Sequence, residues 1–252
     1  MIGRLATSTG LRAATRAASA MGASRSAAAV VSPSFRSMAL RSIVSSTSPL
    51  LSDAAAAIPD DPAMFCRQCE QARDNVGCST VGVCGKTPEA SNAQDALIHF
   101  IKIVSSWCVS AREAGATAEE MKAANVWTLQ AAFATLTNVN FSEVRIAYIT
   151  QDGLKVKDDL EKLVTAKGGT PPDAALDNLP LSFHELEEYG KSVGVLARKA
   201  KMGHDDAYAL NELATAGAKG VSAYAAHAHQ LGFMDEDNIM APLHEVWAKL
   251  AS

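Results

Sequence analysis

The chain has 252 residues, of which 48% are hydrophobic, so it can form one large domain or two small ones around an ordinary core. No run of about 18 consecutive apolar residues occurs, and the sequence therefore predicts no membrane-spanning helix. The formal net charge is −4. Such an acidic chain lacks the basic face that usually binds nucleic acid, so we expect no nucleic-acid partner.

The first 52 residues differ in composition from the rest of the chain. They contain six Arg but no Lys, Asp or Glu, and they are rich in Ser and Ala. This composition is typical of a transit peptide for a mitochondrion or a plastid. We therefore interpret residues 1–60 as an organelle transit peptide or a disordered leader, and we expect the folded part to begin near Met64. Without such an address the protein would be cytoplasmic.

Four cysteines lie close together in the loop at residues 64–88. They are separated by two, eight and five residues, and the glycines at 77, 82 and 85 allow the backbone to curl tightly around them. A [4Fe-4S] cluster needs four thiolates that converge from a short loop. The spacing thus predicts a metal and cofactor site made by Cys66, Cys69, Cys78 and Cys84.

Other interpretations of this loop are open. A zinc ribbon also uses four thiolates, but it usually separates two CxxC pairs by about 15–20 residues. Two disulfides would be unusual inside an organelle, and a thioredoxin-like CxxC would need a βαβ setting. The residues Gly85, Lys86 and Thr87 resemble the end of a phosphate-binding loop, but Thr80 stands where that motif has Gly.

From Pro88 onward the hydrophobic pattern has a helical period, with no sustained alternation typical of strands. Thr117 with Glu120 and Ser182 with Glu185 are capping-box pairs that mark two helix starts. The fold is therefore predicted to be all-α, with two three-helix bundles at residues 89–252. The helices are expected near 88–115, 117–139, 142–164, 182–196, 205–231 and 235–250, with a linker at about 168–181.

Two of the predicted helices contain residues that disfavour a continuous helix. Asp152 and Gly153 are expected to kink or divide the third helix, and Pro242 is expected to kink or restart the last one. Both expectations concern the inside of a helix and leave the fold class unchanged.

The loop and the start of the first helix resemble hybrid-cluster proteins, also called hydroxylamine reductases or prismane proteins. The resemblance rests on the sequences Cys66-Arg67-Gln68-Cys69-Glu70-Gln71, Gly77-Cys78 and Val81-Gly82-Val83-Cys84-Gly85-Lys86-Thr87-Pro88-Glu89. It continues more weakly through Gln94-Asp95-Ala96-Leu97, Tyr224-Ala225-Ala226-His227-Ala228 and Leu231-Gly232, and covers about Met64 to Ser252.

The resemblance implies an N-terminal domain of two three-helix bundles whose cysteines bind a [4Fe-4S] cluster. It also implies the two-electron, two-proton reduction of hydroxylamine to ammonia and water at a second, hybrid iron–sulfur–oxygen cluster. In the family a histidine, two glutamates and four cysteines from later domains bind that second cluster. Here Cys108 is the one further cysteine, so the ligands of the hybrid cluster are missing and no catalytic residue is assigned.

Cys108 lies on the apolar stripe of the first predicted helix and is interpreted as a buried structural thiol. His227, His229 and His244 do not match the ligand position of the family and are interpreted as structural or surface residues. Two functions are then compatible with the sequence. The chain is either the N-terminal part of a hydroxylamine reductase, served by an unknown redox donor protein and acting on a small nitrogen substrate once completed, or a stand-alone iron–sulfur module for electron transfer or interaction.

Overall fold

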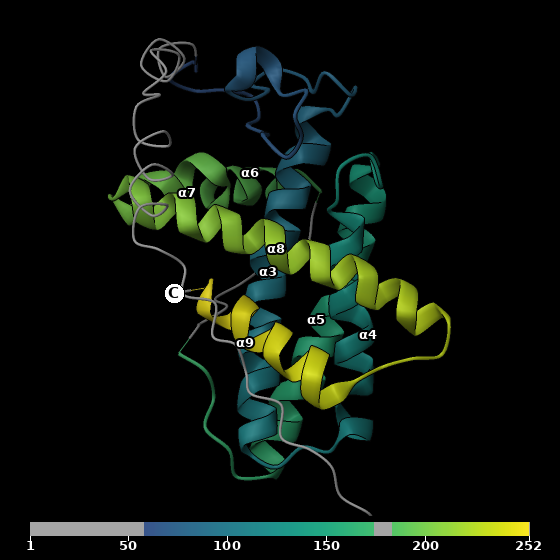
Figure 1. The fold of residues 1–252 in the computed structure, drawn as a ribbon. Helices are drawn as coiled ribbons and strands as arrows, with labels where there is room; N and C mark the ends of the chain where they lie inside the picture. Colours follow the sequence, from purple (N-terminus) through teal and green to yellow (C-terminus); the bar gives the residue numbers. More distant parts are fainter. Residues whose placement is uncertain (1–57, 174–182, 252) are drawn as a thin grey trace, which may run out of the picture. The chain divides into compact units, whose positions relative to one another are not determined.

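The computed structural model describes residues 58–173 and 183–251, and this part of the chain is all-α as predicted (Figure 1). Residues 1–57 of the predicted leader and most of the predicted linker lie outside the described residues. The helical elements are η2 (Arg73–Asn75), α3 (Pro88–Glu113), α4 (Ala118–Ala134), α5 (Glu143–Ala166), α6 (Phe183–Val193), α7 (Val195–Met202), α8 (Asp205–Gln230), η3 (Glu236–Met240) and α9 (Ala241–Lys249).

Helix α3 lies at the centre of the fold (Figure 1). It contacts α4, α5, α6 and α9, and 19 of its 26 residues are buried. A helix that is apolar on most of its circumference must be covered on several sides. The helices before and after the linker therefore share one hydrophobic core, which is built around α3.

Helices α3 and α4 begin where the sequence predicts a helix start. The Thr87 side chain accepts a hydrogen bond from the Ala90 N–H, and Pro88 occupies the first turn of α3. Thr117 and Glu120 form the predicted capping box of α4, in which each side chain accepts from the backbone of the other residue. The predicted starts of α3 and α4 are thus confirmed. Ser182 lies outside the described residues.

The predicted break at Asp152 and Gly153 is wrong, because α5 is continuous from Glu143 to Ala166. Gly153 instead lets α5 approach two aromatic rings, since a Cβ atom there would lie 2.2 Å from the ring of Trp127 and 2.6 Å from that of Phe100. Those rings meet edge to face with centroids 5.5 Å apart. The glycine serves packing between helices and does not interrupt the helix.

The helix predicted at residues 182–196 is divided at Gly194 into α6 and α7. Helix α6 also contains Gly190, which lies where α6 packs very closely on α3. A Cβ atom on Gly190 would lie 1.9 Å from the backbone oxygen of Asn92, so α6 and α3 are nearly in backbone contact there. The restart expected at Pro242 is confirmed, since the wide turn η3 ends at Met240 and Pro242 lies in the first turn of α9.

A buried polar network fastens η3 and α9 to α3 and α4. Arg112 donates to Glu236 at 2.7 Å and to Asn125 at 3.0 Å. A further Arg112 nitrogen lies 2.9 Å from Nδ1 of His244, whose Nε2 lies 3.0 Å from the Thr128 hydroxyl. Burial, followed by the charge of Arg112, lowers the pKa of His244 to about 3. Both ring nitrogens of His244 are occupied, in agreement with its structural interpretation.

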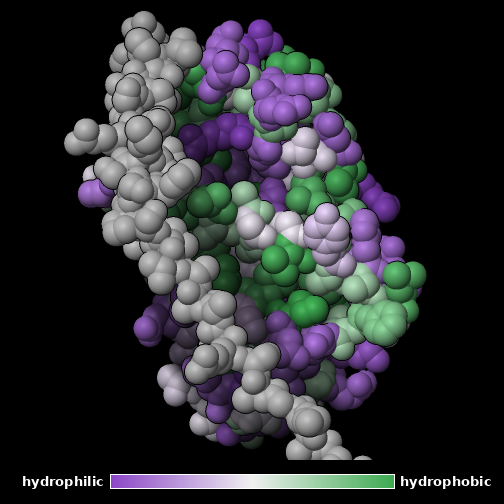
Figure 2. All heavy atoms as spheres, viewed as in Figure 1, coloured by the Kyte–Doolittle hydropathy of each residue, from purple (hydrophilic) through white to green (hydrophobic). Residues whose placement is uncertain are grey.

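The face formed by α8 and α9 is apolar on its solvent side (Figure 2). Leu213 and Tyr224 are 70% and 82% exposed, and a groove of about 640 Å³ runs between α8, η3 and α9. Helix α8 therefore carries apolar side chains on its outer face as well as on the face that packs on α4. Even so, none of the helices in the described ranges combines the length and the apolar character that crossing a membrane requires.

Gly153 provides a test of the packing between α5 and the aromatic pair. We expect Gly153→Ala to lower the free energy of unfolding by about 1–3 kcal/mol, because the added methyl group forces the Trp127 and Phe100 rings to move. Gly217 in α8 is a matched control with open space around it, and Gly217→Ala should raise that free energy by up to about 1 kcal/mol. Urea denaturation of both variants measures the two effects. Equal stabilisation by both substitutions would contradict the packing role of Gly153.

Candidate metal centre

The cysteine loop is closed by a short antiparallel bridge between Cys66 and Cys78. The Cys66 N–H donates to the Cys78 carbonyl at 3.0 Å, and the Cys78 N–H donates back at 2.8 Å. A third bond, from the Met64 N–H to the Ser79 carbonyl at 3.2 Å, extends the bridge. Residues directly opposite each other in such a pair project to the same face. The bridge therefore brings two of the four predicted ligands together.

Cys69 lies in the turn that leads from this bridge into η2. Its carbonyl accepts from the Ala72 N–H at 3.2 Å. Asp74 and Asn75 follow with φ values of 57° and 58°, a left-handed conformation that Asp and Asn tolerate better than most residues. Gly77 then packs so closely on the Phe65 ring that a Cβ atom would lie 2.6 Å from it. These contacts determine the path of the chain between Cys69 and Cys78.

Cys84 lies on an exposed stretch of the loop just before α3. A tight turn surrounds it, in which the Gly85 N–H donates to the Gly82 carbonyl and the Gly82 N–H donates to the Lys86 carbonyl, both at 2.8 Å. Gly85 has a φ of 87°, which a residue with a side chain rarely adopts. The turn delivers the chain directly to the Thr87 cap, so the position of Cys84 depends on the start of α3.

All four loop cysteines are free thiols, so neither of the two disulfides considered from the sequence is present. Within the described ranges, no three His, Cys, Asp or Glu residues are gathered into a group that could hold a metal ion. The loop thus pairs Cys66 with Cys78 and does not bring Cys69 and Cys84 into one ligand shell with them. In the chemistry of its donors, a set of four thiols in one short loop fits an iron–sulfur cluster.

Lys86 is buried at the end of the cysteine loop, just before the Thr87 cap of α3. Its side chain is 2% exposed, and its Nζ donates to Gln94 Oε1 at 2.6 Å and to the sulfur of Cys66 at 3.7 Å. Gln94 in turn donates to the backbone carbonyl of Asn140 at 2.8 Å. The Lys86 ammonium group is therefore held against a predicted ligand by the neutral side chain of Gln94.

A second lysine reaches the loop from α8. Lys219 Nζ donates to Gln68 Oε1, between the first two cysteines, at 3.0 Å and to the Thr135 carbonyl at 2.7 Å. Burial, followed by the charge of Lys86, lowers the pKa of Lys219 to about 8. No ion pair found among the described residues includes either lysine. Both buried ammonium groups thus lack a carboxylate partner in direct contact.

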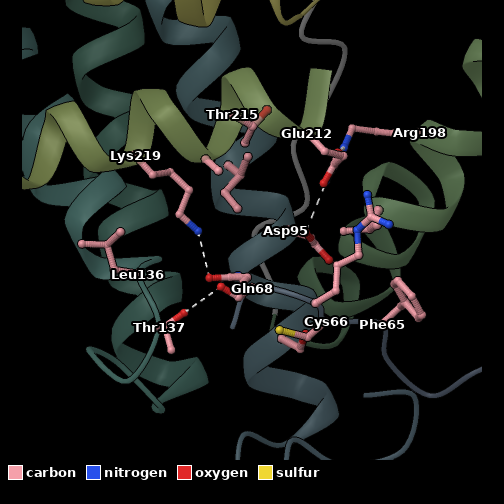
Figure 3. A pocket seen from close by; sticks show the side chains of 15 residues that line it. Phe65, Cys66, Gln68, Asp95, Leu136, Thr137, Arg198, Glu212, Thr215 and Lys219 are labelled. Atoms are coloured by element: carbon pink, nitrogen blue, oxygen red, sulfur yellow. Dashed lines mark hydrogen bonds and ion pairs between the residues drawn. The ribbon is translucent and has the colours of Figure 1, made fainter. Parts of the chain in front are cut away.

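A cavity of about 300 Å³ lies next to Cys66, between the loop, α3, α7 and α8. Figure 3 shows Lys219 and Gln68 on one side of it and Asp95, Arg198 and Glu212 on the other. Arg198 pairs with Glu212 at 2.8 Å and with Asp95 at 3.9 Å. Burial raises the pKa of Asp95 to about 6, although the charge of Arg198 opposes the rise. The wall of the cavity is therefore strongly charged close to the loop.

Comparison of the sequence with known proteins identifies the family of the chain. Residues 64–252 match the model of the Prismane/CO dehydrogenase family. The chain belongs to this family. The resemblance seen in the cysteine loop is thereby confirmed, and the match begins at the residue where the folded part was predicted to start.

Several hydroxylamine reductases are similar to this member of the prismane family. That of Caldanaerobacter subterraneus subsp. tengcongensis is 35% identical over 191 residues, which are 74% of this chain and 33% of the relative. That of Desulfitobacterium hafniense is 34% identical over 175 residues, 68% of this chain and 31% of the relative. That of Methanosarcina mazei is 37% identical over 174 residues, 69% of this chain and 31% of the relative. The chain thus spans about a third of the length of these relatives.

The sequence alone did not reveal the charged residues around the cysteine loop. Asp95, Arg198 and Lys219 come from three helices and are separated by up to 124 positions, so no local spacing connects them. One signal was present, because Asp95 and Lys102 are charged residues on a helix that otherwise reads as apolar. Buried charges of this kind indicate partners elsewhere in the fold.

The ion-pair group next to the cavity makes a testable contribution to stability. Arg198→Met leaves the buried carboxylates of Asp95 and Glu212 without their cation, and we expect it to lower the free energy of unfolding by about 3–5 kcal/mol. The exposed pair of Lys155 and Asp152 is the control, since Lys155→Met should cost at most about 0.5 kcal/mol. Urea denaturation at neutral pH measures both. A loss for Arg198→Met no larger than that for Lys155→Met would show that the buried pair is not needed.

Proposed function

We propose that this chain is the N-terminal, [4Fe-4S]-binding part of a hydroxylamine reductase and that it carries electrons to the reaction. The single observation that carries the proposal is a loop with four free thiols in a chain of the prismane family, which is similar to several hydroxylamine reductases. Cys66, Cys69, Cys78 and Cys84 would hold the cluster. When bound, the cluster would supply a one-electron redox couple.

The surroundings of the loop support an anionic group at this place. The thiolates of an iron–sulfur cluster give it a negative charge, and two buried lysines without carboxylate partners lie against the loop. The four thiols would have to converge further than they do in the described loop, and bound metal commonly orders its own ligands in this way.

A stand-alone electron-transfer or interaction module is the second candidate function. The observation that favours it is the environment of Cys108, the one cysteine outside the loop. This thiol is fully buried in the core, where burial raises its pKa to about 12, so it is not available as a ligand. The 252 residues therefore offer no cysteine set for a second cluster. An organelle address in residues 1–60 and a redox donor protein remain predictions.

Cluster binding can be tested on the full chain by anaerobic reconstitution with iron and sulfide. We expect about four irons and four sulfides per chain, with a broad visible absorption. Cys69→Ala and Cys78→Ala should abolish that absorption, because each removes a ligand. Cys108→Ala is the matched control, and it should keep the cluster while losing packing stability. Zinc bound in a 1:1 ratio, with no visible absorption after reconstitution, would refute the proposal.

Catalysis by these residues alone provides a second test. Reduction of hydroxylamine requires a metal with an open coordination position, and a cluster whose four irons are all bound by cysteine has none. We therefore expect the reconstituted chain, supplied with reduced viologen, to release no more ammonia from hydroxylamine than the cluster-free chain does. Adding the remaining two-thirds of a related hydroxylamine reductase should produce turnover that Cys66→Ala impairs. Rapid ammonia release by the chain alone, lost in Cys66→Ala, would show that substrate reacts at the loop.

A further inference from the structure

Two buried ammonium groups lie against the cysteine loop, one from the residues just before α3 and one from α8. Lys86 precedes α3 and donates to the Cys66 sulfur, and Lys219 projects from α8 and donates to the Gln68 side chain. Figure 3 shows Lys219 directed at Gln68, with Cys66 close by. Two buried cations therefore lie close to the first two cysteines of the loop.

Neutral groups hold both lysines in place. Gln94 fixes the Lys86 ammonium at 2.6 Å, and the Thr135 carbonyl fixes that of Lys219 at 2.7 Å. Neither lysine forms an ion pair with a carboxylate of the described residues. Burying the two ammonium groups is costly and they also repel each other, while the charge of Asp95 offsets part of this cost without direct contact. An anionic group bound by the loop would offset this cost and would explain why both lysines are buried there.

The two lysines therefore place positive charge beside the cysteines of the loop. Because the lysines are buried, solvent and salt screen their fields much less than they screen a surface charge.

We propose that Lys86 and Lys219 are positioning residues that raise the reduction potential of the cluster held by the loop. The inference rests on the proposed function. On reduction the cluster takes one electron from an external reductant, no bond is broken, and its charge becomes more negative by one unit. A nearby fixed cation stabilises the reduced state more than the oxidised state, so the potential rises. The hydrogen bond from Lys86 to the Cys66 sulfur acts in the same direction.

The test is a redox titration of the reconstituted 252-residue chain, followed by electron paramagnetic resonance of the reduced cluster. Lys86→Met and Lys219→Met keep side-chain length and remove the charge, so each should shift the midpoint potential to a more negative value, and the double variant should shift it further. Lys86→Arg keeps the charge and should retain a potential near that of the unsubstituted chain. Lys155→Met removes an exposed lysine, 77% exposed, and should leave the potential unchanged.

The outcomes separate this inference from the proposed function. If the unsubstituted chain forms no cluster, the proposed function fails and the inference fails with it. If clusters form and either single Met variant titrates at the potential of the unsubstituted chain, the inference is overturned while the proposed function stands. Should Lys86→Met lose its cluster, Lys219→Met decides, because Lys219 donates to the Gln68 side chain and not to a cysteine. An equal shift in Lys155→Met would show a general charge effect and would also overturn the inference.

Discussion

The burial of α3 is the constraint on which the rest of the structure depends. Because 19 of its 26 residues are buried, its first turn cannot move without disturbing the common core. That first turn begins at Pro88, four residues after Cys84, so the core determines where the cysteine loop ends. The same helix carries Gln94 and Asp95, which orient the charges beside the loop. The packing of the core around α3 therefore also determines where the cysteine loop and its neighbouring charges lie.

The charges around the loop cost stability in the cluster-free chain. Lys86 and Lys219 are buried without carboxylate partners, and the pKa of Asp95 is raised to about 6 because burial disfavours its charged form. A cluster with negative charge would offset part of this cost, so cluster binding and folding stability should be coupled. The free thiols and the pocket next to Cys66 thus belong to a region that a bound anionic group would stabilise.

The helices were predictable because their signals are local. The Thr117 capping box, the Pro88 start and the restart at Pro242 each rest on residues within one or two turns. Gly153 misled the prediction for the opposite reason. Its role is set by Trp127 and Phe100, which lie 26 and 53 positions away, and no local pattern reveals a ring packed against a helix. The four thiols were found by their spacing, whereas Lys219 depended on a contact across 151 positions.

The contrast between Cys108 and the loop cysteines shows how position decides the chemistry of one residue type. Cys108 faces the core of α3, where burial raises its pKa to about 12 and keeps it a neutral packing group. The Cys66 sulfur, by contrast, receives a hydrogen bond from a buried ammonium group. That ammonium group is held by Gln94, which belongs to the same helix that buries Cys108, so α3 determines the surroundings of both thiols.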